Sequence, residues 1–214
     1  MKPTDTIGVL QPQRSAGDHV RKRRSPGSME KPSVGVELVV FTVIDSDLKV
    51  LLIKRREQPF KGVWSLPGGL VQVRNSGDQG ENIDDAAHRV LFETTGIIPS
   101  TCTVEQLCAF GKAGRDPRTR LISIAWTALV SPDQLPRQPH PLDNDIQWFS
   151  ANEEIPWMRL SFDHAEILDT AVHRIRSQLD TTNIAFHLVA KTFTVAELRD
   201  THEAIKSHHY DARN

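Results

Sequence analysis

The chain has 214 residues, which is room for one domain of typical size and a smaller second one. Its formal net charge of -1 at pH 7 gives no general attraction to nucleic acid or to membranes. No apolar run approaches the ~20 residues that cross a bilayer, and the N-terminal region lacks the apolar core of a signal peptide. We therefore expect no membrane partner. The two cysteines, Cys102 and Cys108, stand in no paired motif, so we expect buried free thiols. The absence of a disulfide framework favours a cytoplasmic protein.

Residues 1–32 are polar and rich in Pro, Gly and Ser, with four consecutive basic residues at 21–24. Such a composition buries too little apolar surface to become ordered, so we expect a disordered basic tail. The basic cluster has the chemistry to contact phosphate, but a solvated tail is the simpler interpretation.

A hairpin is predicted next. Val34 to Ile44 is a nearly continuous apolar and β-branched run, residues 45–47 form a turn, and Lys49 to Ile53 is a second strand. Runs of this kind are typical of strands that are buried on both faces. Arg55 and Arg56 follow the second strand and are candidates for contact with a diphosphate, which Arg binds bidentately; a solubility cluster is the alternative.

Residues 60–97 read as a strand, a glycine turn, an irregular loop, an amphipathic helix and a glycine stop. Gly68 and Gly69 allow a ligand to approach the backbone closely, although a simple turn would also explain them. The helix begins near Asp84, and its inward stripe recurs at spacings of three and four residues: Ala86, Ala87, Val90 and Leu91.

This segment resembles the Nudix box, a loop and helix that hold a divalent metal over a nucleoside diphosphate. Gly96 closes the box, so that Arg89 is the box arginine, Glu93 the first of its paired glutamates, and Glu81 the single glutamate upstream. The resemblance assigns Arg89 to the ligand site. Two box glutamates are missing, because Val90 and Thr94 stand in their places. A third departure is Asn75, which occupies the position of a box glycine.

The missing carboxylates bear on the chemistry. Glutamates at i, i+3 and i+4 share a helix face and can hold Mg²⁺, which then polarises a phosphate while a carboxylate activates water. Here that face keeps only Glu93, with Glu81 as a second possible oxygen donor. Glu93 and Glu81 are therefore the catalytic candidates, and Glu93 the candidate magnesium ligand, only if the protein is an active hydrolase. Otherwise Glu93 is a solvated helix residue.

The remaining elements alternate strands with turn-rich connections and end in helices. Strands are predicted at 104–110, 121–130 and 146–149, a long helix from Phe162 to Leu179, a short apolar helix at 184–189, and a last helix at 195–206. Thr194 and Glu197 have the spacing of a capping box for the last helix. The pair at 208–209, His-His, is more simply solvated than metal-binding.

Three segments, 110–118, 160–168 and 193–198, resemble the NrtR family of Nudix-related regulators of NAD metabolism. The resemblance implies an α+β fold, in which a Nudix α/β/α sandwich with a mixed sheet is followed by a small helical, partial winged helix-turn-helix segment. It divides the chain into the tail (1–32), a nucleotide-sensing domain (33–157) and a hinge helix with an incomplete DNA-binding domain (158–214). It also implies a homodimer.

The same resemblance places Arg115, Asp116 and Arg118 near the ligand and the dimer partner, although a loop of salt bridges would also explain these charges. It makes residues 162–166 the hinge, with a structural role for His164. It also makes Arg213 and Asn214 the start of a recognition helix and hence weak candidates for contact with an operator. Because the sequence stops there, we expect either a shortened chain or a protein that has lost specific DNA reading.

These features favour a transcriptional regulator that binds ADP-ribose or another NAD-related diphosphate as effector and needs no cofactor for sensing. The alternatives are a Mg²⁺-dependent hydrolase of ADP-ribose or similar compounds and a scaffold that binds no nucleotide. The loss of the two glutamates favours a sensor over an enzyme.

Overall fold

A computed structural model describes residues 31–73, 80–136, 145–152 and 159–207. The described residues belong to one compact unit that begins at Lys31. Residues 1–30 of the predicted tail, Asn75, the histidine pair at 208–209, and Arg213 and Asn214 lie outside the described residues. The same holds for the predicted domain boundary at 157/158, because residues 153–158 are not described. None of the described helices is long and apolar enough to span a membrane.

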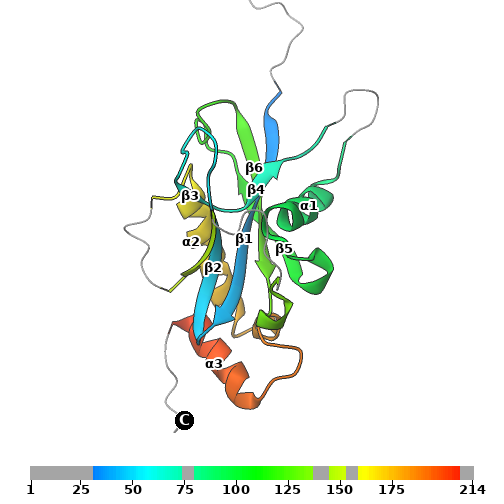
Figure 1. Ribbon diagram of the computed structural model, residues 1–214, viewed down its shortest axis with the longest axis vertical. Coiled ribbons are helices and arrows are strands. Elements are labelled where there is room, and N and C mark those ends of the chain that lie inside the picture. The colour runs from blue at the N-terminus through cyan, green and yellow to red at the C-terminus, as the bar shows by residue number, and fades with distance from the viewer. Residues whose placement is uncertain (1–30, 74–79, 137–144, 153–158, 208–214) are drawn as a thin grey trace, which may run out of the picture. The chain divides into compact units, whose positions relative to one another are not determined.

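The fold is built on a seven-stranded mixed sheet with the main order β3-β2-β1-β6-β5, β4 pairing with β1 and β7 with β2 (Figure 1). The strands are β1 (Ser33–Ile44), β2 (Asp47–Lys54), β3 (Trp64–Ser65), β4 (Gly68–Leu70), β5 (Thr103–Phe110), β6 (Leu121–Leu129) and β7 (Ile146–Ser150). β1 runs parallel to β6 and antiparallel to β2, so the predicted mixed sheet is confirmed.

β1 and β2 separate partway along their length. They pair from Phe41 opposite Val50 to Ile44 opposite Asp47, and beyond this point β1 continues beside β4 while β2 continues beside β3. Glu37 of β1, for example, lies opposite Gly68 of β4. This separation leaves a space between the two halves of the sheet, and the candidate site lies in it.

Both faces of β1 are buried, as predicted for the hairpin. Val39, Phe41 and Val43 pack in a core cluster with the helices of the C-terminal third, whereas Leu38 and Val40 pack with the stripe of the box helix. The two clusters lie on opposite sides of the sheet because strand side chains alternate. Figure 1 shows α1 and α2 on opposite faces, which is the expected α/β/α layering.

The helices follow local signals closely. α1 (Ile83–Thr95) buries its predicted stripe and ends at Gly96, whose φ of 73° places it in the left-handed region. α3 (Val195–Lys206) carries the predicted capping box. The structure also contains the 3-10 turns η1 (Pro99–Thr101), η2 (Pro132–Gln134) and η4 (Ile184–His187). The last stands where a short apolar helix was predicted at 184–189, but it is a 3-10 turn and ends two residues earlier.

Two predictions need correction. α2 spans His164–Gln178 and not 162–179, because Phe162 has φ 55° and Asp163 has φ -104°, neither of which continues a helix. Cys102 and Cys108 are free, as expected, but they are half-buried and not buried. Burial nevertheless raises the pKa of the Cys102 thiol to about 11, so that this thiol is unreactive at neutral pH.

Candidate ligand-binding site

A cavity lined by five charged side chains lies where β1 and β2 separate. It has a volume of about 140 Å³, and its walls come from both strands, from β3 and β4, from the loop before β6 and from the start of α2. Ligand sites usually enclose ~300–1,000 Å³. The cavity therefore has room for one part of a nucleotide, and the remainder of such a ligand would lie across its mouth.

Gly68 and Gly69 form one wall of this cavity. A Cβ atom on Gly68 would lie 3.1 Å from the carbonyl oxygen of Val36, and one on Gly69 would lie 2.9 Å from Cγ2 of Val90. A side chain at either position would therefore require neighbouring atoms of β1 or of the box helix to shift. The contact of Gly68 and Gly69 with a ligand stays a prediction.

Two arginines flank one aromatic ring in the cavity wall. The guanidinium carbon of Arg55 lies 4.8 Å from the centre of the Phe162 ring, and that of Arg118 lies 5.8 Å from it. Arg118 is held bidentately by Asp116, whereas Arg55 Nε donates to the carbonyl oxygen of Pro59 at 2.8 Å. Burial, and then the nearby charge of Arg118, lower the pKa of Arg55. This part of the cavity lining thus carries two guanidinium groups, and among the described residues no ion pair joins Arg55 to a carboxylate.

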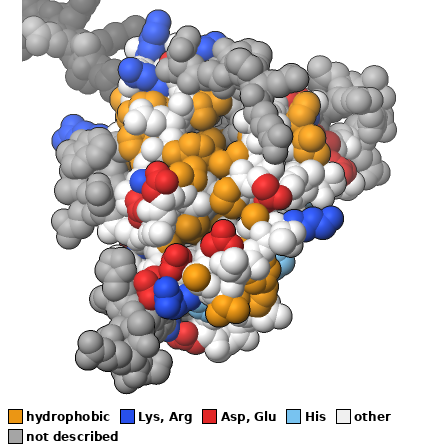
Figure 2. All heavy atoms as spheres, turned by 60° about the horizontal axis from the view of Figure 1, so that its bottom comes forward, with side chains coloured by type: hydrophobic (Ala, Val, Ile, Leu, Met, Phe, Trp, Pro, Cys, Tyr) orange, Lys and Arg blue, Asp and Glu red, His pale blue; other side chains and the backbone are white. Residues whose placement is uncertain are grey.

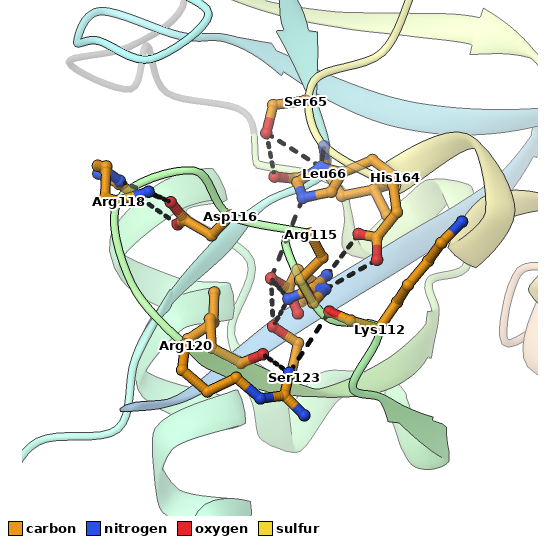
Figure 3. A network of polar contacts seen from close by, with 12 residues as sticks. Ser65, Leu66, Lys112, Arg115, Asp116, Arg118, Arg120, Ser123 and His164 are labelled. Carbon is orange, nitrogen blue, oxygen red and sulfur yellow. Dashed lines mark hydrogen bonds and ion pairs between the residues drawn. The ribbon is translucent and has the colours of Figure 1, made fainter. Parts of the chain in front are cut away.

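Arg115 has a different environment. Its side chain is only 2% exposed and donates two hydrogen bonds to Asp163, at 2.6 and 2.8 Å, and one to Ser123 (Figure 3). It lies 3.6 Å from Glu37 Oε1, which also accepts a hydrogen bond from Ser123 at 2.7 Å. Arg115 therefore joins the loop before β6 to the start of α2, and its charge is already compensated within the protein.

Glu37 is the buried acid of this network. It is 7% exposed, lines the cavity, and its Oε2 atom has no hydrogen-bond partner among the described residues. Burial raises the pKa of this carboxyl group, although the Ser123 hydroxyl and Arg115 act in the opposite direction. The carboxylate thus keeps acceptor capacity that the described protein groups do not use.

His164 is the first residue of α2 and is also buried in the cavity wall. Its Nδ1 atom accepts a hydrogen bond from the backbone N–H of Leu66 at 3.0 Å and lies 3.2 Å from Ser65 Oγ (Figure 3). Burial lowers the pKa of His164 to about 3, so the ring is neutral at pH 7 and its single proton is on Nε2. These bonds give His164 the structural role that was predicted, by connecting α2 to the β3–β4 turn.

The remnant of the Nudix box is organised around Arg89. This arginine donates to both oxygens of Glu81, at 2.9 and 2.6 Å, to Glu93 at 2.8 Å and to the carbonyl oxygen of Leu70 at 3.1 Å. Glu81 also accepts the backbone N–H of Gln72 at 2.7 Å, and the hydrogen bonds from Arg89 lower its pKa. Both surviving carboxylates are therefore committed to ion pairs with one side chain.

The donor set does not fit Mg²⁺, which prefers carboxylate oxygens in octahedral arrangement. Val90 is buried, and the Thr94 hydroxyl donates to the carbonyl oxygen of Val90 at 2.6 Å. Within the described parts of the chain no three Asp, Glu, His or Cys side chains are grouped so that they could hold a metal ion.

The structure separates the predicted site residues into two groups. The cavity brings together six of them: Arg55, Gly68, Gly69, Arg115, Asp116 and Arg118. Arg89, Glu81 and Glu93 lie together on the box helix side, outside the cavity lining, and Arg56 pairs with Asp145 at 2.6 Å. Glu37 and Phe162 line the cavity but were not among the predicted site residues. The signal for Glu37 in the sequence was an acidic residue within an otherwise apolar strand.

Comparisons with known proteins agree with this architecture. The model of the NUDIX domain matches residues 35–171. The chain is 30% identical to the ADPR responsive transcriptional repressor NtrR of Acinetobacter baylyi, over 85% of this chain and 70% of that protein. It is 34% identical to an ADP-ribose pyrophosphatase of Methanocaldococcus jannaschii, over 64% of this chain and 71% of that protein.

Solved structures give the same result. Shewanella oneidensis NrtR superposes with a TM-score of 0.72 at 30% identity, covering 85% of this chain and 81% of that one. The NUDIX domain of the same protein, solved in complex with ADP ribose, matches with a TM-score of 0.58 at 32% identity, covering 72% and 94%. The chain therefore belongs to the NUDIX domain family and, within it, to the NrtR-type transcriptional regulators.

Proposed function

We propose that this protein is a transcriptional regulator of NAD metabolism whose cavity binds ADP-ribose, or a related nucleotide diphosphate, as an effector. The observation that carries the proposal is the pair of guanidinium groups on the Phe162 ring, 4.8 and 5.8 Å from its centre. The charge of Arg55 is partly buried beside that of Arg118, and a diphosphate at this point would neutralise Arg55 and accept hydrogen bonds from it. Arg118 is paired with Asp116 through Nε and Nη2, so that its Nη1 group would be the donor to the same diphosphate. The names of the regulator and of the ADP ribose complex among the similar proteins support the same effector.

Effector binding has a direct physical route to the C-terminal helices. Phe162 and His164 line the cavity; His164 is the first residue of α2, and Phe162 stands two residues before it. The Arg115–Asp163 ion pair ties the same point to the loop before β6. A ligand that moves the Phe162 ring therefore acts on the segment predicted to be the hinge, which is how the proposed sensor would influence the C-terminal part.

The proposal is tested by calorimetric titration of ADP-ribose into the full chain, with and without Mg²⁺. We expect binding in both conditions, because the contacts are to arginines and backbone. Arg55→Gln and Arg118→Gln should each weaken binding about ten- to hundredfold, the usual value of a charge-assisted hydrogen bond. Arg120→Gln, on the same loop as Arg118 but outside the cavity lining, is the matched control and should bind as the parent does. Absence of binding in both conditions would contradict the proposal.

We further propose DNA and a second copy of the chain as partners, with residues 33–157 as the sensor and 158–214 as the hinge and DNA-binding part. α3 alone carries Glu197, Asp200 and Glu203 against Arg199 and Lys206, so it is no cationic surface. Figure 2 shows acidic, basic and apolar side chains mixed on this end of the molecule. DNA contact would therefore need further basic residues, such as the predicted Arg213.

Selection of binding sequences from a random duplex pool, with light scattering for the mass of the complex, tests both partners. We expect an enriched two-fold symmetric site bound by two chains, and a loss of affinity on addition of ADP-ribose. An unselected pool together with a monomer mass would contradict both partners.

The second candidate is hydrolysis of ADP-ribose with Mg²⁺, favoured by the surviving Glu81 and Glu93 and by the similar pyrophosphatase. Its expected signature is release of AMP that Glu93→Gln abolishes. The ion pairs of both carboxylates with Arg89 argue against it, because a metal would have to displace them.

A further inference from the structure

The inner wall of the cavity carries chemistry that a diphosphate does not use. Arg55 and Arg118 supply positive charge on one part of the cavity lining, whereas Glu37 and His164 are a buried acid and a neutral imidazole. A phosphate oxygen can only accept hydrogen bonds and would be repelled by the carboxylate of Glu37. A different part of the ligand must therefore match Glu37 and His164.

The hydrogen-bonding roles of these two residues are determined by their neighbours. Nδ1 of His164 is occupied as an acceptor by the N–H of Leu66, at 3.0 Å, so Nε2 carries the proton and is a donor. Glu37 Oε1 already accepts from Ser123 at 2.7 Å, whereas Oε2 has no partner within the described structure. The pair consequently offers one donor and one acceptor.

Their separation points to a single bridging group. Nε2 of His164 and Oε1 of Glu37 are 4.0 Å apart, beyond the length of a direct hydrogen bond. One oxygen atom at ~2.8 Å from each would close a triangle with this side, and Oε1 can accept this second hydrogen bond beside that of Ser123 because a carboxylate oxygen has two lone pairs. A hydroxyl is the group that accepts from a nitrogen and donates to a carboxylate at the same time, whereas an aromatic amino group only donates.

We propose that Glu37 and His164 form a hydroxyl-binding pair, which makes a sugar hydroxyl of the effector the feature that this protein recognises beyond its diphosphate. The inference rests on the proposed function, since it assigns a second contact of the same ligand. A bound hydroxyl would also offset part of the cost of burying the Glu37 carboxylate, whose Oε2 has no hydrogen-bond partner among the described residues.

Three variants test the pair by calorimetry with ADP-ribose. Glu37→Gln keeps the shape but loses the anionic acceptor, and should weaken binding about ten- to hundredfold. His164→Asn keeps an acceptor near the position of Nδ1 for the Leu66 N–H but removes the Nε2 donor, and should weaken binding about three- to tenfold. Thr42→Val is the matched control: Thr42 is also on β1, is also buried with an unpaired oxygen, but does not line the cavity, so affinity should be unchanged.

Two analogues identify which hydroxyl is bound. ADP lacks the terminal sugar, and a dideoxy analogue of ADP-ribose lacks the hydroxyls of the adenosine ribose. The penalty of Glu37→Gln should disappear with one of them and persist with the other. A penalty that persists undiminished with both would overturn the proposal, since the bound donor would then not be a sugar hydroxyl.

The outcomes separate the two claims. If the unmodified protein binds ADP-ribose and Glu37→Gln and His164→Asn bind it equally well, the hydroxyl pair is wrong and the proposed function stands. If the unmodified protein does not bind, both fail. If the thermal unfolding of the two variants is unchanged, a loss of affinity is due to the lost contact and not to misfolding. If Thr42→Val loses affinity equally, the effect comes from the packing of β1, and the proposed hydroxyl-binding pair is overturned.

Discussion

At the scale of single residues, the molecule concentrates its unusual chemistry in one buried network. Glu37, Arg115, Ser123 and His164 are buried side by side, and the half-buried Asp163 pairs with Arg115. The ionised groups are compensated mainly by the bidentate Arg115–Asp163 pair, and the removal of one partner from such a pair is costly because the other charge stays buried. His164 stays neutral because the effect of its burial outweighs the nearby charge of Asp163.

The first prediction concerns His164 and pH. Its pKa in the folded protein, about 3, lies below the unfolded value of 6.5. Burial is the largest cause; Arg115 and Arg55 lower the pKa further, and Asp163 raises it. Glu37 also faces the ring. The unfolded chain therefore binds the proton first, and stability present above pH 6.5 is lost as the pH falls toward 3. The free energy of unfolding should drop by up to ~1.4 kcal/mol per pH unit in this window from this group alone.

Urea unfolding at pH 7, 6 and 5 measures this slope. The slope should be shallower in His164→Asn by that amount, and unchanged in His88→Gln, which alters an exposed imidazole on α1. Equal slopes in the parent and in His164→Asn would show that the buried imidazole does not resist protonation.

At the scale of elements, α3 begins at a complete reciprocal cap. Thr194 Oγ1 accepts the N–H of Glu197 at 3.2 Å, and the Glu197 carboxylate accepts the N–H of Thr194 at 2.6 Å. The cap satisfies backbone donors that the first turn of a helix leaves free. It also fixes the start of the helix that leads toward the predicted DNA-binding residues.

The second prediction follows from this cap. Thr194→Ala should lower the free energy of unfolding by about 1 kcal/mol, the usual cost of removing a helix cap. Thr170→Ala is the matched control, because Thr170 stands within α2 and bonds only back to Glu166, so that Ala there should be neutral or slightly stabilising. Denaturant titration of both variants measures the difference, and a Thr194→Ala variant as stable as the control would show that the cap adds nothing.

At the scale of the whole molecule, the sensor sheet and the C-terminal helices share a core. Residues of β1 and β2 occur in the same buried cluster as Ile167 and Ile175 of α2, Leu188 after η4, and Ile205 of α3. Because a close-packed core transmits displacement, we expect effector binding on one side of this core to displace the helices on the other side.

The third prediction is a single cooperative unfolding transition that ADP-ribose shifts as a whole. At a free concentration of ~100 Kd the ligand should add about 2.7 kcal/mol to the free energy of unfolding. Thermal unfolding followed by tryptophan fluorescence and by far-UV circular dichroism measures it, with AMP, which lacks the diphosphate, as the weaker ligand. Transitions that differ between the two probes, with only one shifted by ligand, would instead show that the sheet and the C-terminal helices unfold separately.

The sequence by itself determined the elements whose signals are local. The hairpin, the stripe and glycine stop of α1 and the capping box of α3 all agree with the structure, because each depends on residues within one or two turns or strands of each other. It also indicated the family, since the box register and the flanking segments are contiguous motifs. The start of α2 was placed two residues early, because the left-handed backbone of Phe162 depends on its packing beside Phe60 and the arginines.

Only the tertiary structure decided what the site is made of. Glu37, Arg115 and His164 are separated by long stretches of chain and meet because β1 and β2 part and α2 begins at their gap. The structure also showed that Arg115 is compensated internally and that Arg89 occupies both remaining box glutamates. Which charges remain available for a ligand depends on distances between segments remote in sequence, and no local pattern of residues encodes those distances.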